Sequence, residues 1–184
     1  SLDQLIGVAP AAGDTLVLIG ETAGHLGQSA LLAELFGREE GDAPPVELDA
    51  ERRAGLLVRA AKAAGLLSAA HDLADGGLAV AAAEMALAAG AGVTIEADES
   101  LAPLAWFFGE DQGRYLLGTR DPAGLLALAV TADVPARAVG RVYLQTRRSQ
   151  GTIFHHADAA CLDPKSPACI PDAYSRPASE TREL

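Results

Sequence analysis

The amino-acid sequence predicts a layered α/β domain, and three observations support that prediction. Short apolar runs alternate with alanine- and leucine-rich helical patterns through about residue 145, which is typical of helices packed on a sheet. Glycine, proline or a capping residue separates most of these segments. Of the 184 residues 49% are hydrophobic but only 4% are aromatic, so the core is expected to consist mainly of Ala, Leu and Val.

The first predicted elements are a strand and a helix. Residues 15–19 (TLVLI) form an almost continuous apolar run after a Gly-Asp turn, which predicts a strand buried on both faces. Ser29 is then a suitable N-cap for a helix whose apolar stripe lies within residues 31–36. Gly37 is expected to end this helix.

A second helix and strand follow a loop that contains two adjacent prolines. Asp49 is expected to cap a helix over residues 50–64, with Gly65 as its stop. The apolar run 66–71 predicts a short strand. An alanine-rich helix follows it and is expected to end near Gly90.

The alternation continues in the second half of the chain. Asp121 followed by Pro122 is a strong start signal for a helix, because proline fits the first helical position and aspartate caps it. The other expected segments are a strand at 92–97, a short helix and turn at 101–113, and strands at 114–119 and 137–144.

Periodicity disappears after about Arg148. We therefore expect a domain of residues 1–147 and an irregular or disordered tail of residues 148–184. The metal-ligating side chains of the tail do not have zinc-site spacing, and no metal site is assigned to them: His155, His156, Cys161 and Cys169.

Composition excludes several classes of function. The formal net charge of −11 argues against binding to nucleic acid or to an anionic membrane surface. No apolar run approaches the roughly 20 residues that cross a bilayer, and the first residues do not resemble a secretory signal. With only two cysteines, both near the end, the chain is expected to be cytoplasmic, and its start resembles a chain entered partway.

The run HDLADGG, residues 71–77, joins a predicted strand to a predicted helix. Asp75 is expected to cap the helix that starts at Gly76 and Gly77. His71 and Asp72 lie at the carboxyl end of the strand, where ligand sites of α/β proteins commonly occur. The run is therefore either a structural strand-to-helix turn or a site for a phosphate or nucleotide at a helix start.

Two further runs are candidate sites. A phosphate could rest on the amides of Gly27, Gln28 and Ser29, although the surrounding loop is not a Walker motif and a helix cap is the commoner use of such a pattern. The second run places two carboxylates together, which suits Mg²⁺ but also suits a solvated turn: Glu110, Asp111, Gln112 and Arg114. Glu84 is a lone carboxylate in an alanine helix, where a surface or partner-facing position is the default. No Ser–His–Asp or Cys–His arrangement is evident in residues 1–147.

Three stretches occur together in the order and spacing of one family: residues 13–53, 70–87 and 106–119. Over about residues 1–147 the chain resembles the C-terminal region of phosphoribosylformylglycinamidine synthase, the large ATP-dependent subunit (synthase II) of purine biosynthesis. The run from His71 to Leu78 is the most specific part of the resemblance.

The resemblance implies an aminoimidazole-ribonucleotide-synthetase C-terminal-like domain, a mixed sheet covered by helices (α+β). The family converts formylglycinamide ribonucleotide, ATP and glutamine-derived ammonia to the amidine, ADP and phosphate. Its catalytic, ATP-binding and Mg²⁺-binding residues lie mainly in N-terminal-like domains, so no catalytic residue is assigned here and the chain alone is expected to be inactive. The run from Glu110 to Arg114 resembles a pseudo-symmetric counterpart of the family's substrate-binding stretch.

The implied partners are the N-terminal domains of the same enzyme, a glutaminase subunit and a small bridging subunit. Two alternatives stay open at this point. The chain could belong to another superfamily member, a thiamine-phosphate kinase or a selenophosphate synthetase. It could also be a stand-alone phosphate-binding module.

Overall fold

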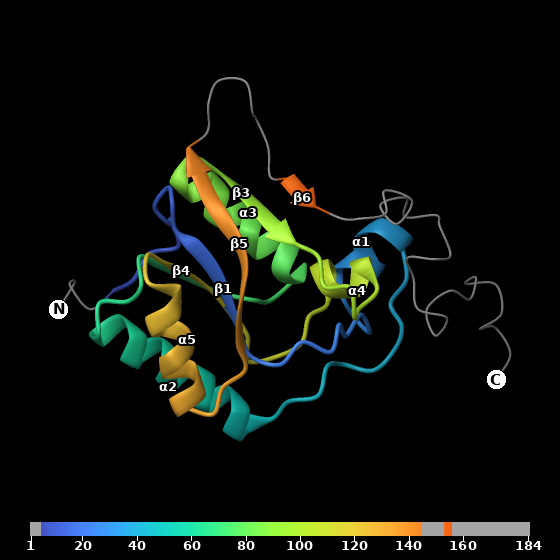
Figure 1. The fold of residues 1–184 in the computed structure, drawn as a ribbon. Helices are drawn as coiled ribbons and strands as arrows, with labels where there is room; N and C mark the ends of the chain where they lie inside the picture. The colour runs from blue at the N-terminus through green and yellow to red at the C-terminus, as the bar shows by residue number, and fades with distance from the viewer. Residues whose placement is uncertain (1–4, 145–152, 156–184) are drawn as a thin grey trace, which may run out of the picture.

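The computed structural model describes residues 5–144 and 153–155, which form one sheet with helices on both faces (Figure 1). Along the chain the elements are β1 (Thr15–Ile19), α1 (Ala30–Phe36), α2 (Leu48–Ala63), β2 (Ala69–Asp72), α3 (Gly77–Ala89), β3 (Ala91–Glu96), α4 (Pro103–Phe108), β4 (Tyr115–Thr119), α5 (Pro122–Thr131), β5 (Ala136–Leu144) and β6 (Ile153–His155).

The strand order in the sheet is β2-β4-β1-β5-β3-β6. The first five strands pair antiparallel, whereas β3 and β6 pair in parallel. The sheet is therefore mixed and covered by helices, which confirms the fold expected from the sequence. β1 occupies an inner position, and Ile19 at its end pairs with Tyr115 at the start of β4.

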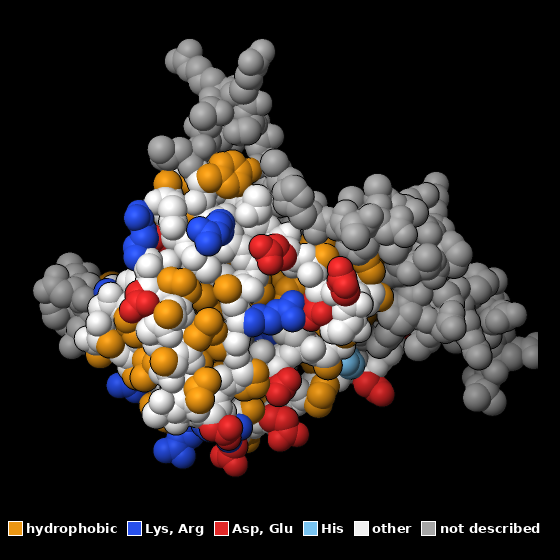
Figure 2. Space-filling view, viewed as in Figure 1, with side chains coloured by type: hydrophobic (Ala, Val, Ile, Leu, Met, Phe, Trp, Pro, Cys, Tyr) orange, Lys and Arg blue, Asp and Glu red, His pale blue; other side chains and the backbone are white. Residues whose placement is uncertain are grey.

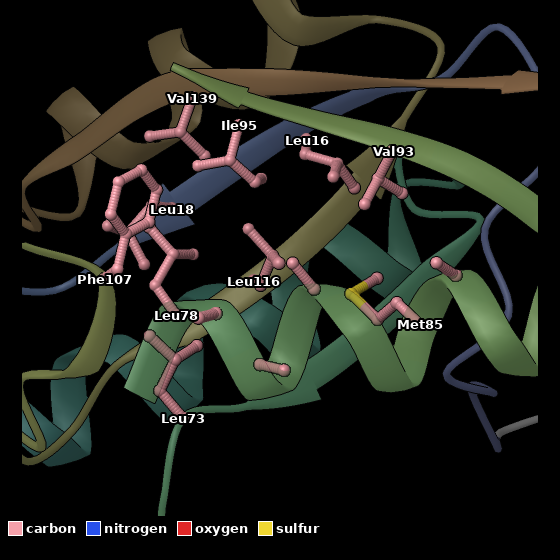
Figure 3. Close-up of a cluster of buried hydrophobic side chains, with 14 of the residues drawn as sticks. Leu16, Leu18, Leu73, Leu78, Met85, Val93, Ile95, Phe107, Leu116 and Val139 are labelled. Atoms are coloured by element: carbon pink, nitrogen blue, oxygen red, sulfur yellow. The ribbon is translucent and has the colours of Figure 1, made fainter. Parts of the chain in front are cut away.

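The side chains of β1 divide the core into two halves. Leu16 and Leu18 belong to a buried cluster that includes α3, and Val17 and Ile19 belong to another that includes α2 and α5. This alternation follows from the period of two in a strand. It confirms that β1 is buried on both faces, as its continuous apolar sequence predicts. Figure 3 shows the first cluster, with the strand side chains directed onto α3.

Several local predictions are confirmed by the caps. The hydroxyl of Ser29 accepts a hydrogen bond from the Leu32 amide at 3.4 Å, and α1 ends at Gly37 in the left-handed conformation. The Asp121 carboxylate accepts a hydrogen bond from the Gly124 amide at 2.9 Å and so caps α5. Short-range signals of this kind depend only on residues within one turn of the helix start.

One prediction about a helix start is wrong. Asp49 does not cap α2, because the helix begins at Leu48 and Glu47 is at the N-cap without a side-chain bond; Asp49 lies in the first turn, where its charge still favours the helix dipole. Of the segment predicted to be a tail, the structure describes only β6, which pairs with β3, and the division into domain and tail stays a prediction. The predicted domain boundary at 147 and the tail residues His156, Cys161 and Cys169 lie outside the described residues.

Trp106, the only tryptophan of the chain, is buried at one end of the sheet. Its indole N–H donates to the Glu96 carbonyl at 3.0 Å, and the Arg137 guanidinium lies 4.2 Å from its ring centre. Arg137 also pairs with Asp98 at 2.6 Å. Trp106 fluorescence is therefore a reporter of folding at this corner.

The pKa of Asp98 is lowered, first by hydrogen bonds from Ser100 and then by the charge of Arg137. A carboxyl group whose pKa is lower in the folded chain stabilises that fold above its unfolded pKa and loses this contribution as the pH falls through the folded value. We expect Asp98→Asn to reduce the free energy of unfolding by less than about 1 kcal/mol at pH 7. The difference from wild type should vanish in strong acid, and urea titrations followed at several pH values would measure it. A difference that grows on acidification would contradict this assignment.

In the part of the chain that the structure describes, no helix is long and apolar enough to span a bilayer.

Candidate functional site

Three polar or glycine-rich segments meet at one end of the sheet (Figure 1). They are the loop 20–29 after β1, the turn 73–76 between β2 and α3, and the turn 109–114 between α4 and β4. β1 and β2 end where antiparallel β4 begins, so the register brings the three segments together. These segments contain nine of the twelve site residues that the sequence predicts, and the other three, His71, Asp72 and Gly77, flank the turn 73–76.

Glu110 joins two of these segments through a single oxygen atom. Its Oε1 accepts hydrogen bonds from the Ala30 amide at 2.9 Å and from the Gly76 amide at 2.7 Å. Ala30 is the first residue of α1, and Gly76 is the N-cap of α3. The backbone amide of Glu110 also donates to the His25 carbonyl at 2.8 Å. One side chain therefore fixes the starts of two helices relative to each other.

Asp111 and Arg114 hold the loop after β1. The Asp111 carboxylate accepts from the amides of Gly24 at 2.9 Å and His25 at 3.3 Å. Arg114 is 1% exposed and donates to the carbonyls of Gly109 at 2.5 Å and Asp111 at 3.1 Å. The turn 109–114, called the clamp below, is therefore held by buried Asp111 and Arg114 side chains. It differs from the solvated turn that its charged sequence favours.

Burial lowers the pKa of Arg114, because the charged guanidinium is removed from water. The negative charges of Asp111 and Glu110 oppose this shift and favour the charged form. The guanidinium lies 3.8 Å from the nearer Asp111 carboxylate oxygen. Arg114 is therefore the buried positive charge that balances the two acids of the clamp.

Three glycines allow the segments to touch. A Cβ on Gly77 would lie 2.4 Å from the Gly109 carbonyl oxygen, and a Cβ on Gly109 would lie 2.7 Å from the Cα of Gly24. Such distances are too short for a side chain at any of these backbone contacts. The glycine-rich motifs are thus required for the mutual packing of the three segments.

His71 and Glu84 form a separate pair beside the site. The His71 Nε2 atom lies 2.8 Å from the Glu84 carboxylate, and its Nδ1 atom lies 2.5 Å from the Asp72 carbonyl oxygen. Glu84 is half-exposed, so the surface position expected for it is correct, although it is not alone. The pair links the end of β2 to the middle of α3.

Asp75 does not cap α3, contrary to the sequence prediction, because no side chain bonds to the first turn from the N-cap position. The amide of Gly76 is satisfied by Glu110 instead, from 34 residues away. Two of the three predicted phosphate-binding amides have partners within the chain: the Gln28 amide donates to the Glu40 carbonyl and the Ser29 amide to the Leu26 carbonyl. Gly77 donates to Ala74, which closes the turn before α3.

Two adjoining hollows lie beside the clamp. One, of about 350 Å³, is bordered by five of the predicted site residues: Asp72, Asp75, Glu110, Gln112 and Arg114. The other, of about 310 Å³, shares Glu51, Gln112 and Gly113 with it and extends to the start of α2. Figure 2 shows acidic side chains near that helix start, where Glu47 and Asp49 lie. Among the charged residues that line these two hollows, together called the groove below, acidic side chains outnumber the arginines.

Tyr115 borders the first hollow, and sequence reasoning missed it. Burial raises the pKa of its hydroxyl, and the charges of Glu51 and Asp72 raise it further. The phenol therefore stays protonated as a hydrogen-bond donor well into the alkaline range. Its position at the start of the strand after the Glu110–Arg114 run is the only sequence signal that points to it.

Comparison with known protein families shows which family this chain belongs to. Residues 11–149 match the family described as AIR synthase related protein, C-terminal domain. The chain belongs to this family. The match covers all the strands from β1 to β5 and all three segments of the site, so the glycine-rich junctions are part of an AIR synthase-related C-terminal domain.

Two curated relatives with the same name illustrate the similarity. The chain is 56% identical over 143 residues to phosphoribosylformylglycinamidine synthase subunit PurL of Cereibacter sphaeroides, which covers 77% of this chain and 19% of the relative. It is 45% identical over 167 residues to the protein of the same name from Caulobacter vibrioides, which covers 91% of this chain and 22% of the relative. The chain thus spans about a fifth of the length of these relatives.

Solved structures show the same fold. PurL of Thermotoga maritima complexed with FGAR matches with a TM-score of 0.64 at 21% identity, covering 77% of this chain and 26% of that one. A thiamine-monophosphate kinase from Stenotrophomonas maltophilia matches with a TM-score of 0.53 at 19% identity, covering 82% of this chain and 53% of that one. At these identities the likeness concerns the fold alone.

Proposed function

We propose that this chain is the C-terminal domain of a phosphoribosylformylglycinamidine synthase, the large ATP-dependent subunit. In the complete protein the reaction would convert formylglycinamide ribonucleotide, ATP and glutamine-derived ammonia to the amidine, ADP and phosphate. The observation that supports this most strongly is the 56% identity over 143 residues to a protein of that name. The kinase match, at 19% identity, carries no comparable support for the alternative of a thiamine-phosphate kinase.

The role we assign to this domain is architectural, with no catalytic residue of its own. Residues 5–144 and 153–155 contain no group of three His, Cys, Asp or Glu side chains that could hold a metal ion. Glu110 and Asp111 are engaged with backbone amides, so they do not fit a Mg²⁺ site in this arrangement. We propose that ATP and Mg²⁺ bind mainly to the part of the protein outside this chain.

We propose that the groove beside the clamp faces that neighbouring part. Five predicted site residues border it, and Tyr115 adds a protonated hydroxyl. The further partners in this proposal are a glutaminase subunit and a small bridging subunit. A structure titled PurLQS from Thermotoga maritima, a protein of the same fold, is in keeping with a multi-subunit assembly.

A chimera tests the proposed function directly. The 143 matching residues of the Cereibacter sphaeroides protein would be replaced by those of this chain. With formylglycinamide ribonucleotide, ATP, Mg²⁺ and ammonium chloride, we expect ADP release within about tenfold of the natural protein. The isolated chain should show no turnover under the same conditions.

The matched control replaces the same region with the corresponding domain of the Stenotrophomonas maltophilia kinase, which shares the fold at low identity. This chimera should be inactive. A folded but inactive first chimera would contradict the proposal, as would turnover by the isolated chain. Phosphorylation of thiamine monophosphate by the isolated chain would favour the kinase alternative.

A further inference from the structure

We propose that Glu110 is the built-in anion of this domain. Its carboxylate occupies the meeting point of the two glycine-rich helix starts, positions both, and excludes an external phosphate from them. The proposal concerns the chain itself and does not depend on the activity of the longer protein.

The geometry of the carboxylate supports the first part of this proposal. Helix starts present backbone amides that lack partners within the helix, and such amides bind phosphate or carboxylate oxygens. Here Oε1 of Glu110 accepts from Ala30 at the start of α1 and from Gly76 at the start of α3. The two donors lie 80 and 34 residues from Glu110 in the sequence, so the carboxylate holds two distant segments together.

Four other amides at the two helix starts also have acceptors within the chain. Gln28 and Ser29 donate to the carbonyls of Glu40 and Leu26. Gly77 donates to Ala74, and Leu32 donates to the Ser29 hydroxyl. A phosphate would have to displace the Glu110 carboxylate to reach the amides of Ala30 and Gly76.

The charges around Glu110 explain why a carboxylate is favourable at this position. The buried guanidinium of Arg114 interacts favourably with the charge of Glu110, which raises the pKa of Arg114 against the effect of burial. Glu110 also borders the hollow of about 350 Å³, together with Asp72 and Asp75. Three carboxylates at this face repel a phosphate group. Glu110 therefore acts as a positioning residue that also determines which ligands the face admits.

The test uses the 184-residue chain and inorganic phosphate as the probe. In ¹⁵N-resolved NMR spectra, the amides of Ala30 and Gly76 in the wild type should not shift with millimolar phosphate beyond the shift caused by sodium chloride of equal ionic strength. Saturable shifts of these two amides in the wild type would overturn the proposal.

Substitution provides the second measurement. Glu110→Ala should lower Tm by about 5–10 °C, because two charge-assisted hydrogen bonds are lost. Phosphate or formate should restore part of this loss by occupying the vacated position. Glu110→Gln keeps an acceptor in place and fills the space, so we expect a smaller loss of Tm and no restoration by phosphate.

Asp121→Ala is the matched control, because it removes a carboxylate that caps only one helix, α5, at an exposed site. If phosphate stabilises Glu110→Ala no more than it stabilises Asp121→Ala, the proposal fails. If Glu110→Ala does not fold in chloride, recovery of the folded Trp106 fluorescence during refolding in phosphate supports the proposal, and failure to recover overturns it. These stability and refolding measurements do not depend on whether the chimera described under the proposed function is active.

Discussion

Arg114→Met is expected to lower the free energy of unfolding by about 3–5 kcal/mol, since it removes one partner of a buried ion pair. The Arg114 side chain is 1% exposed, and its guanidinium donates to the carbonyls of Gly109 and Asp111. Methionine fills much of the volume but leaves these acceptors and the Asp111 charge without a cation. Urea titration followed by Trp106 fluorescence would measure the loss.

Two control substitutions separate charge from packing in this test. Arg59→Met lies on the exposed face of α2 and should change stability by less than about 0.5 kcal/mol. Arg114→Lys keeps the charge but cannot reproduce the planar fork, so it should also destabilise the fold, by less than the methionine variant. A loss below about 1 kcal/mol for Arg114→Met would mean that water reaches the guanidinium and that the clamp is not buried.

The sequence predicts those features that depend on neighbouring residues. The cap at Asp121 and the stop at Gly37 each involve contacts within one turn, and the structure confirms both. The alternation of strands and helices and the double burial of β1 follow from hydrophobic pattern in the same way. Asp49 shows the limit of such signals, because Glu47 precedes it and α2 begins one residue before it.

Features that depend on long-range contacts could not be predicted. Asp75 has the right residue type and position for a cap, yet the Gly76 amide is satisfied by Glu110. Nothing local to Glu110 indicates that its carboxylate reaches Ala30, 80 residues earlier. The residue types of the three runs mark each of them individually as a candidate site, but their convergence follows from a strand order that the sequence does not reveal.

Gly77→Ala is expected to destabilise the chain by about 3–5 kcal/mol, from two separate effects. The backbone of Gly77 is left-handed, with φ of 60°, which a residue with a Cβ adopts only at a cost. The added Cβ would also lie 2.4 Å from the Gly109 carbonyl oxygen, which belongs to the backbone beside the clamp and has little room to move. Differential scanning calorimetry and urea titration would both report the loss.

Gly90→Ala isolates the second effect. Gly90 ends the same helix with φ of 58°, nearly the conformation of Gly77, but a Cβ there would meet no atom within 4 Å. We expect this variant to lose only about 1–2 kcal/mol, the cost of the left-handed backbone. The difference between the two variants then measures the close approach of α3 to the turn that carries Glu110. Equal losses at the two positions would mean that the turn moves aside freely, and the clamp would not then hold the helix starts in fixed positions.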